Sequence, residues 1–188
     1  MSKETRVFVV AGPSGAGKGT LIGRALERLG DIDYSVSTTT RPRAPGEVEG
    51  KDYYFLSEEQ FDDLVDKDAF LEWEEVFGKR YGTLASEVDK ARSLGHDVLL
   101  ELDVKGALTV KSKIKDALLV FVMPPTLDAL ESRLKNRNRE DAGDIGRRTK
   151  LAPGEIQVGK SEFDVIIVNE DIEEAAAKLV RVLRGEST

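Results

Sequence analysis

The chain of 188 residues contains no cysteine and only one histidine. Without cysteine it can form no disulfide and can perform no thiolate chemistry. The single histidine, His96, follows a glycine at the expected end of a helix, where a surface position is favoured over a catalytic one. These absences direct attention to carboxylates, hydroxyls and cationic side chains.

Long apolar runs and an excess of positive charge are also missing. No segment approaches the roughly 20 apolar residues of a membrane span, and the N-terminus lacks the apolar stretch of a signal peptide. The net charge of −7 disfavours general binding to nucleic acid or anionic membranes. We therefore expect a single-domain cytoplasmic protein that binds small molecules, neither nucleic acid nor membrane. Whether it is a monomer or a homo-oligomer stays open.

Glycine, in contrast, is plentiful and concentrated near the N-terminus. The apolar run Val7–Val10 is followed directly by Gly12-Pro13-Ser14-Gly15-Ala16-Gly17-Lys18-Gly19-Thr20. A strand that breaks into a glycine-rich turn and then opens a helix directs backbone N–H groups and the helix dipole at one point. This pattern predicts a polyphosphate-binding loop, with Lys18 reaching the terminal phosphates. A glycine-rich turn without a ligand is the alternative, but such a turn would not need Lys18.

The loop departs from its commonest form at one position. Gly19 occupies the place where a serine or threonine usually binds Mg²⁺. We therefore expect the ion to be held by phosphate oxygens, by water and by Thr20.

The rest of the chain alternates apolar strands with helices. We expect buried strands at residues 6–10, 34–37, 97–103, 117–123 and 163–168, with a hairpin at residues 70–83. This alternation predicts a parallel α/β sheet covered by helices on both faces. Residues 38–47 are expected to form an ordered loop, and Pro153-Gly154 to interrupt a helix.

Two carboxylates, Glu101 and Asp103, follow the apolar residues of one predicted strand. Because they are two residues apart, we expect them to point the same way, at the sheet edge where ligands collect. A solvated strand end is the alternative. Their position opposite the glycine-rich loop favours contacts with Mg²⁺ or substrate.

At this point the sequence resembles the guanylate kinase family over nearly its full length. The segments that carry the resemblance are Gly12–Thr20, Ser35–Arg41, Gly46–Tyr53, Glu72-Trp73, Tyr81–Thr83, Asp103–Gly106, Pro124-Pro125, Arg133–Arg137, Arg147-Arg148 and Val168-Asn169. The resemblance implies transfer of the γ-phosphoryl group of ATP to GMP, with Mg²⁺ as cofactor. It also implies a P-loop NTPase sheet with an inserted mixed α+β GMP-binding lobe and a helical lid. We expect the core at about residues 1–34, 96–125 and 159–188, the lobe at 35–95 and the lid at 126–158.

The resemblance assigns roles in the GMP site. Glu72 would accept the two adjacent guanine donors, while hydroxyls would serve the guanine O6. The implied GMP-binding residues are Ser37, Arg41, Arg43, Tyr53, Glu72, Tyr81, Thr83, Glu101 and Asp103. Ala44 stands where the family usually has a second arginine, and Arg43 is expected to compensate.

The resemblance also assigns the donor site and the catalytic residues. ATP would bind to residues 12–20, to Arg137 and, near the adenine, to Asn169. The implied catalytic residues are Lys18, Arg41, Arg137 and Arg148, and the implied metal contacts are Thr20 and Asp103.

Two other classes of function fit part of the pattern. One is a related P-loop kinase acting on another small phosphate acceptor, such as a ribose phosphate, which predicts no role for Glu72. The other is a catalytically weak binding module of the same family that recognises a phosphopeptide. The complete loop with Lys18 argues against the second.

Overall fold

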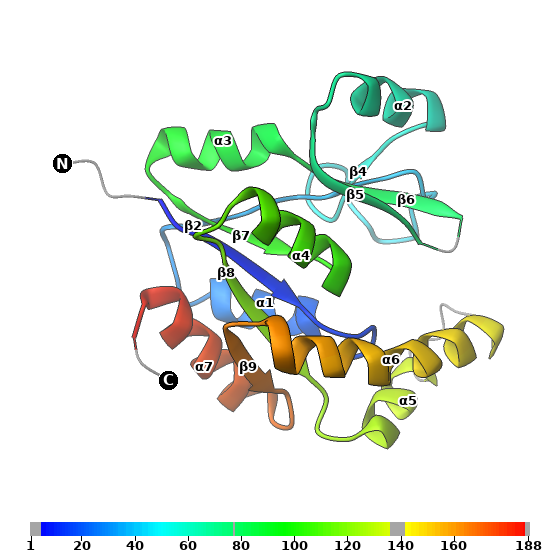
Figure 1. Cartoon of the computed structure of the whole chain (residues 1–188), viewed down its shortest axis with the longest axis vertical. Coiled ribbons are helices and arrows are strands. Elements are labelled where there is room, and N and C mark those ends of the chain that lie inside the picture. Colours follow the sequence, from blue (N-terminus) through cyan, green and yellow to red (C-terminus); the bar gives the residue numbers. More distant parts are fainter. Residues whose placement is uncertain (1–4, 77, 136–141, 187–188) are drawn as a thin grey trace.

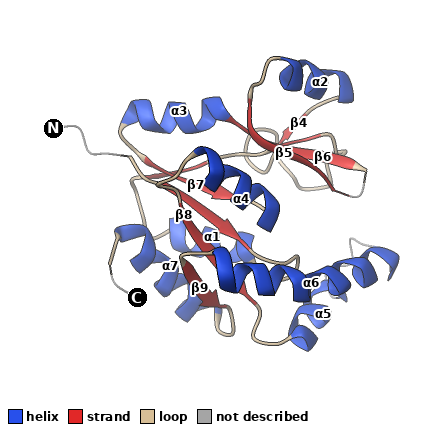
Figure 2. Ribbon diagram, viewed as in Figure 1, coloured by secondary structure: helices blue, strands red, loops and turns tan. Residues whose placement is uncertain are grey.

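A parallel sheet forms the centre of the molecule. The computed structural model describes residues 5–76, 78–135 and 142–186. The five strands of the sheet lie in the order β2-β7-β1-β8-β9, and each pairs in parallel with its neighbours. Figure 2 shows the strands in red and the helices around them in blue. They are β1 (Val7–Ala11), β2 (Ile32–Tyr34), β7 (Asp97–Glu101), β8 (Leu118–Met123) and β9 (Val165–Val168).

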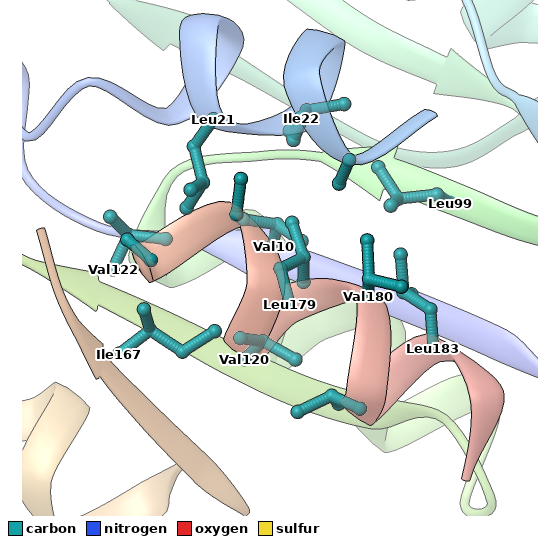
Figure 3. Packing of buried hydrophobic residues seen from close by; sticks show 14 of the residues in the cluster. Val10, Leu21, Ile22, Leu99, Val120, Val122, Ile167, Leu179, Val180 and Leu183 are labelled. Carbon is teal, nitrogen blue, oxygen red and sulfur yellow. The ribbon is translucent and has the colours of Figure 1, made fainter. Parts of the chain in front are cut away.

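Helices cover both faces of this sheet. On one face, α1 (Lys18–Leu26) and α7 (Ile172–Arg184) bury an apolar cluster that includes Leu21, Ile22 and Leu179 (Figure 3). On the other face, α3 (Ala85–Leu94) and α4 (Val104–Lys113) cover β1 and β7. The central strands β1, β7 and β8 are largely apolar because both of their faces are buried. The predicted α/β fold with a parallel sheet flanked by helices is confirmed.

Residues at the helix ends satisfy backbone groups there. Helix α3 ends at Gly95, as expected, and this residue adopts a left-handed conformation with φ 72°. The amide of Ala129 donates to Oγ1 of Thr126 (3.1 Å), which caps the start of α5 (Leu127–Lys135). Such caps satisfy backbone groups that the helix itself leaves without partners. Within the described residues, none of the helices combines the length and apolar character needed to cross a membrane.

A second, smaller sheet lies beside the core, at the upper right of Figure 1. Its strand order is β4-β3-β6-β5, with a helix that begins after a capping box at Ser57. Its elements are β3 (Thr38–Thr39), β4 (Tyr54–Phe55), α2 (Glu58–Asp66), β5 (Phe70–Val76) and β6 (Lys79–Leu84). Helix α3, placed in the lobe by the sequence, packs on β7 of the core. We therefore propose that the lobe ends near residue 84.

The expectation of a loop from residue 38 was wrong at its start. Thr38 and Thr39 form strand β3, which pairs with β6 on one side and with β4 on the other. Partners distant in the sequence supply these hydrogen bonds, so the local composition gave no signal for a strand.

The strand predicted at residues 97–103 ends earlier, at Glu101. Asp103 instead caps α4, and its Oδ1 accepts the amide N–H of Gly106 at 2.7 Å. Helix α4 itself was not predicted. An aspartate followed by a weakly periodic segment was its only signal.

The lid region contains α5 and the long helix α6 (Ala142–Glu162). The predicted interruption at Pro153-Gly154 was wrong, because α6 runs through both residues. Both are exposed, whereas the preceding Ala152 is fully buried against α5. Packing of the inner face of α6 on α5 and β8 therefore offsets the hydrogen bond that Pro153 removes.

Pro153 and Gly154 lower the stability of α6, so replacing either with alanine should raise the free energy of unfolding. Gly154→Ala should raise the free energy of unfolding by about 1 kcal/mol, because alanine is the better helix former. A Cβ at this position meets nothing within 4 Å. Pro153→Ala should raise it at least as much, by restoring a backbone donor. Urea denaturation measures both.

Gly23→Ala in α1 is the matched control, since that position is also exposed and open. It should give a similar gain of about 1 kcal/mol. A gain at Gly23 together with a loss at Gly154 and Pro153 would contradict a continuous α6.

Candidate active site

The glycine-rich loop at residues 12–20, called here the phosphate loop, packs tightly against the ends of two strands. A Cβ at Gly12 would lie 2.2 Å from the carbonyl oxygen of Val122 in β8. A Cβ at Gly17, where φ is +89°, would lie 2.6 Å from Nδ2 of Asn169. Side chains at these two positions would force the loop away from the sheet. Glycine is therefore required for the loop to lie at the carboxyl edge of the sheet.

The side chains of Lys18, within the loop, and of Arg148, on α6, both donate hydrogen bonds to other residues of the loop. The Lys18 ammonium donates to the carbonyl oxygens of Gly12 (2.7 Å) and Pro13 (3.4 Å). Arg148 reaches in from α6, and its Nη1 donates to Oγ of Ser14 at 2.5 Å. Two of the four predicted catalytic cations thus lie at the same loop. Arg41 lies in the lobe, and Arg137 lies outside the described residues.

Asn169 and Arg133 hold the loop from behind. Asn169 is only 3% exposed, and its Nδ2 donates to the carbonyl oxygen of Ala16 at 2.8 Å. Arg133 of α5 donates to the carbonyl oxygens of Asn169 (3.0 Å) and Ala16 (3.5 Å). Arg133 was given no role in the sequence-based assignment, although it belongs to the segment Arg133–Arg137. These contacts join the loop, α5 and the end of β9.

Glu101 and Asp103 face different neighbours. Glu101 ends β7 opposite Val10, accepts the Tyr34 hydroxyl (3.3 Å), and has its Oε2 3.6 Å from where a Gly19 Cβ would lie. Asp103 lies near Glu72, and its charge raises the pKa of the Glu72 carboxyl. The premise that both residues belong to one strand was wrong, because the strand ends at Glu101.

The lobe brings three predicted phosphate-binding residues together. The Arg41 guanidinium lies over the Tyr53 ring at 5.4 Å, and the ring centroids of Tyr53 and Tyr81 are 6.0 Å apart. Burial raises the pKa of Tyr53 to about 12, and the charge of Glu101 adds to the shift. Tyr53 therefore keeps a hydroxyl that can donate to an anion.

Glu47, which was not predicted, orients Arg41. Arg41 Nη2 donates to both carboxylate oxygens of Glu47, at 2.8 and 3.0 Å. The same carboxylate accepts the amide N–H of Ala44 at 2.8 Å, whereas Arg43 is exposed. A fixed guanidinium beside two tyrosine hydroxyls is suited to binding a phosphate dianion.

Glu72 is a buried carboxylate in the wall of the lobe. It is 6% exposed, on β5 opposite Thr83 of β6. Burial raises its pKa to about 7, although the Thr83 hydroxyl and amide oppose the shift, and Asp103 and Glu74 reinforce it. The buried Oγ1 of Thr83 has no well-formed hydrogen bond of its own among the described residues. The Glu72 carboxylate can accept hydrogen bonds from the polar edge of a planar base, and the Thr83 hydroxyl can form a hydrogen bond to the same edge.

Comparison with known proteins identifies the family. The sequence model of the guanylate kinase family matches residues 4–186. The chain belongs to the guanylate kinase family. A guanylate kinase of Thermotoga maritima is 43% identical over 96% of this chain and 87% of its own. One from Thermus thermophilus is 45% identical over 96% of this chain and 81% of its own.

A solved structure extends this agreement to the fold. The guanylate kinase of Anaplasma phagocytophilum superposes with a TM-score of 0.81 at 34% identity, covering 98% of this chain and 87% of that one. The assignment to the guanylate kinase family, made from the order of short motifs, is therefore confirmed.

In this family member the predicted residues fall into two groups at the carboxyl edge of the sheet. The first surrounds the phosphate loop and contains Ser14, Lys18, Thr20, Arg148 and Asn169. The second lies on the lobe or at its border and contains Ser37, Arg41, Tyr53, Glu72, Tyr81 and Thr83. Figure 1 shows the lobe and the lid helices on the same side of the molecule, the side toward which β1 points.

The described residues contain no cluster of three metal-binding side chains. A Mg²⁺ ion in this family member would therefore depend on phosphate oxygens, as the donor chemistry of Mg²⁺ allows. The Glu101 carboxylate reaches toward Gly19, the position that usually supplies a hydroxyl. Thr20 is exposed in the same first turn of α1. This oxygen set fits Mg²⁺.

The raised pKa of Glu72 predicts a pH-dependent stability. Glu72 binds a proton more tightly in the folded chain than in the unfolded one, where its pKa is near 4.5. The stability that protonated Glu72 contributes is therefore fully present below pH 4.5 and is lost as the pH rises through about 7. The neutral variant Glu72→Gln should gain about 2 kcal/mol of unfolding free energy relative to the unmodified chain between pH 5 and pH 8.

Urea denaturation at both pH values measures this difference. Glu75→Gln, on the exposed face of the same strand, is the control and should show no such change. Parallel pH profiles for the unmodified chain and Glu72→Gln would show that Glu72 ionises normally.

Proposed function

We propose that this chain transfers the γ-phosphoryl group of ATP to GMP, giving ADP and GDP. The observation that carries the proposal is the buried Glu72, paired with Thr83, in a lobe inserted beside a phosphate loop. The curated relatives named above, all guanylate kinases, support the same reading. ATP and GMP are its small-molecule partners, and we propose that it acts in the cytoplasm, where both are available.

Glu72 would select guanine by hydrogen-bond complementarity. Guanine presents N1–H and the exocyclic N2–H side by side, and an ionised carboxylate accepts both. The hydroxyls of Thr83 and Ser37 would serve the guanine O6. Adenine would direct an unprotonated N1 at the carboxylate, leaving two acceptors face to face in a buried site. Such mismatches give strong discrimination.

The GMP phosphate would bind to Arg41, Tyr53 and Tyr81. These residues already converge, and Glu47 holds the Arg41 guanidinium by two contacts. The phosphate has a second pKa of about 6 and is a nucleophilic dianion at neutral pH. No general base is therefore required.

The donor triphosphate would bind to the phosphate loop, with Asn169 behind it and Glu101 and Asp103 at its edge. Lys18 and Arg148 would neutralise charge on the transferring phosphoryl group, together with Arg137. To do so, the Lys18 ammonium exchanges its contacts with Gly12 and Pro13 for phosphate oxygens. Mg²⁺ bound with ATP supplies further neutralisation of charge. We propose that Thr20 and Glu101 hold it, rather than Asp103, whose Oδ1 is engaged in capping α4.

The proposal predicts a narrow acceptor range. A coupled assay of ADP release should show turnover with GMP and far less with AMP, CMP, UMP or ribose phosphates. Equal turnover with AMP would contradict guanine selection. Turnover with a ribose phosphate alone would favour a different P-loop kinase, and no turnover with any acceptor would favour a binding module.

The same assay tests Glu72 directly. Glu72→Gln should lose about 10²-fold in kcat/KM for GMP, because the amide presents a donor to a guanine donor. Glu75→Gln, exposed on the same strand, should behave as the unmodified chain. Full activity in Glu72→Gln would contradict the assignment.

Arg43 is expected to assist the GMP phosphate in place of the arginine missing at Ala44. Arg43→Ala should raise KM for GMP severalfold, about the effect of losing one exposed charge contact, with kcat unchanged. Arg92→Ala on α3 removes the same charge at another exposed position and should leave KM unchanged. An unaltered KM in Arg43→Ala would show that Arg43 does not compensate.

A further inference from the structure

Gly106 is a glycine that its own backbone conformation does not require. It is buried in the first turn of α4, and it does not have the left-handed φ that several other glycines of the chain adopt. Alanine could therefore take the same backbone conformation, and alanine is the better helix former. The segment Asp103–Gly106 carries part of the family resemblance, but that resemblance gives Gly106 no role. The reason for a glycine must come from its surroundings.

Two carboxyl groups crowd this position. A Cβ at Gly106 would lie 3.0 Å from Oε2 and 3.4 Å from Cδ of Glu72, and 3.2 Å from Oδ1 of Asp103. Nonbonded heavy atoms in proteins normally approach to about 3.5–4.0 Å, so a neighbour would have to move by a few tenths of an ångström. At Gly23 and Gly154, which also lie in helices, a Cβ would meet no described atom within 4 Å. Gly106 is therefore not interchangeable with these open positions.

Of the two carboxyl groups, that of Glu72 is the one free to respond. Oδ1 of Asp103 accepts the amide N–H of Gly106 at 2.7 Å and caps α4, so the helix itself fixes Asp103. Glu72 belongs to a different element, β5, which lies beside α4 (Figure 1). A side chain at position 106 would therefore push the Glu72 carboxylate away from α4.

The exact place of this carboxylate matters for recognition of a base. Two adjacent donors of guanine require both carboxylate oxygens to lie in line with them. Hydrogen bonds weaken as they lengthen and bend, and small misplacements of binding groups are costly in rate. The bare backbone at Gly106 is therefore a means of keeping Glu72 in line with its ligand.

We propose that Gly106 is a positioning residue of the guanine site: without a side chain in the first turn of α4, the Glu72 carboxylate can lie against that helix and face the base. This role rests on the proposed function, because we propose that Glu72 binds guanine. Gly106 itself would contact no substrate atom. It determines where the Glu72 carboxylate lies.

The first test measures kcat/KM for GMP and the calorimetric affinity for ADP in Gly106→Ala. The value of kcat/KM should fall about tenfold, less than in Glu72→Gln, because the carboxylate is displaced but not removed. The affinity for ADP should stay unchanged, since the phosphate loop is untouched. Gly23→Ala, at an exposed position of α1, is the control and should match the unmodified chain in both measurements. An unchanged kcat/KM in Gly106→Ala would overturn the proposal.

The variant Glu72→Ala separates an effect that passes through Glu72 from a general distortion of α4. It removes the Cδ and Oε2 atoms that a Cβ at position 106 would meet. Adding Gly106→Ala to Glu72→Ala should therefore leave kcat/KM for GMP unchanged within about twofold. A further tenfold loss in this background, or weaker ADP binding by Gly106→Ala, would show a merely structural role and would also overturn the proposal.

Urea denaturation tests the same contact without any substrate. Gly106→Ala should raise the urea midpoint more in the Glu72→Ala background than in the unmodified chain, because the better helix former then meets no carboxylate from β5. An equal shift in both backgrounds would contradict this inference alone. Absence of GMP turnover in the unmodified chain would contradict the proposed function alone, because the urea comparison does not depend on turnover.

Discussion

The close approach of the phosphate loop to the ends of β8 and β9 is the constraint on which the site depends. Gly12 lies against the Val122 carbonyl and Gly17 against the Asn169 amide, at distances that exclude any side chain. Asn169 and Arg133 then fix the Ala16 carbonyl from behind. Because the loop is fixed to the sheet edge, its amides, Lys18 and the start of α1 keep one orientation toward the lobe.

The second constraint is the placement of charged side chains in an acidic protein for which we propose anionic substrates. The net charge is −7, yet cations are concentrated where phosphates are expected, with Lys18 and Arg148 at the phosphate loop and Arg41 in the lobe. Glu47 holds Arg41 by two contacts. Glu72 forms no ion pair within the described part of the chain, burial raises its pKa, and we propose that it binds the base. Burial and pairing therefore separate the carboxylates into different roles.

Much of this could be predicted from the sequence, and the failures have physical causes. The phosphate loop and the buried strands were readable because their signals are local. The family motifs named Arg41, Tyr53 and Tyr81, which lie together in the lobe, and their role in binding phosphate stays a prediction. Strand β3 was missed because its partners are distant in the sequence. The continuity of α6 through Pro153 was missed because tertiary packing overrides local propensity. Glu47 and Arg133 act through another side chain or through carbonyls, and such contacts leave no spacing pattern in one sequence.

The most direct test of the account is a crystal structure of the chain with GMP and ADP bound together. The account predicts the guanine N1 and N2 atoms within hydrogen-bond distance of the Glu72 carboxylate. It also predicts the GMP phosphate against Arg41, Tyr53 and Tyr81, and the ADP phosphates on the amides of residues 12–20. A guanine bound elsewhere, with Glu72 still buried against Thr83 and in contact with no ligand, would contradict it.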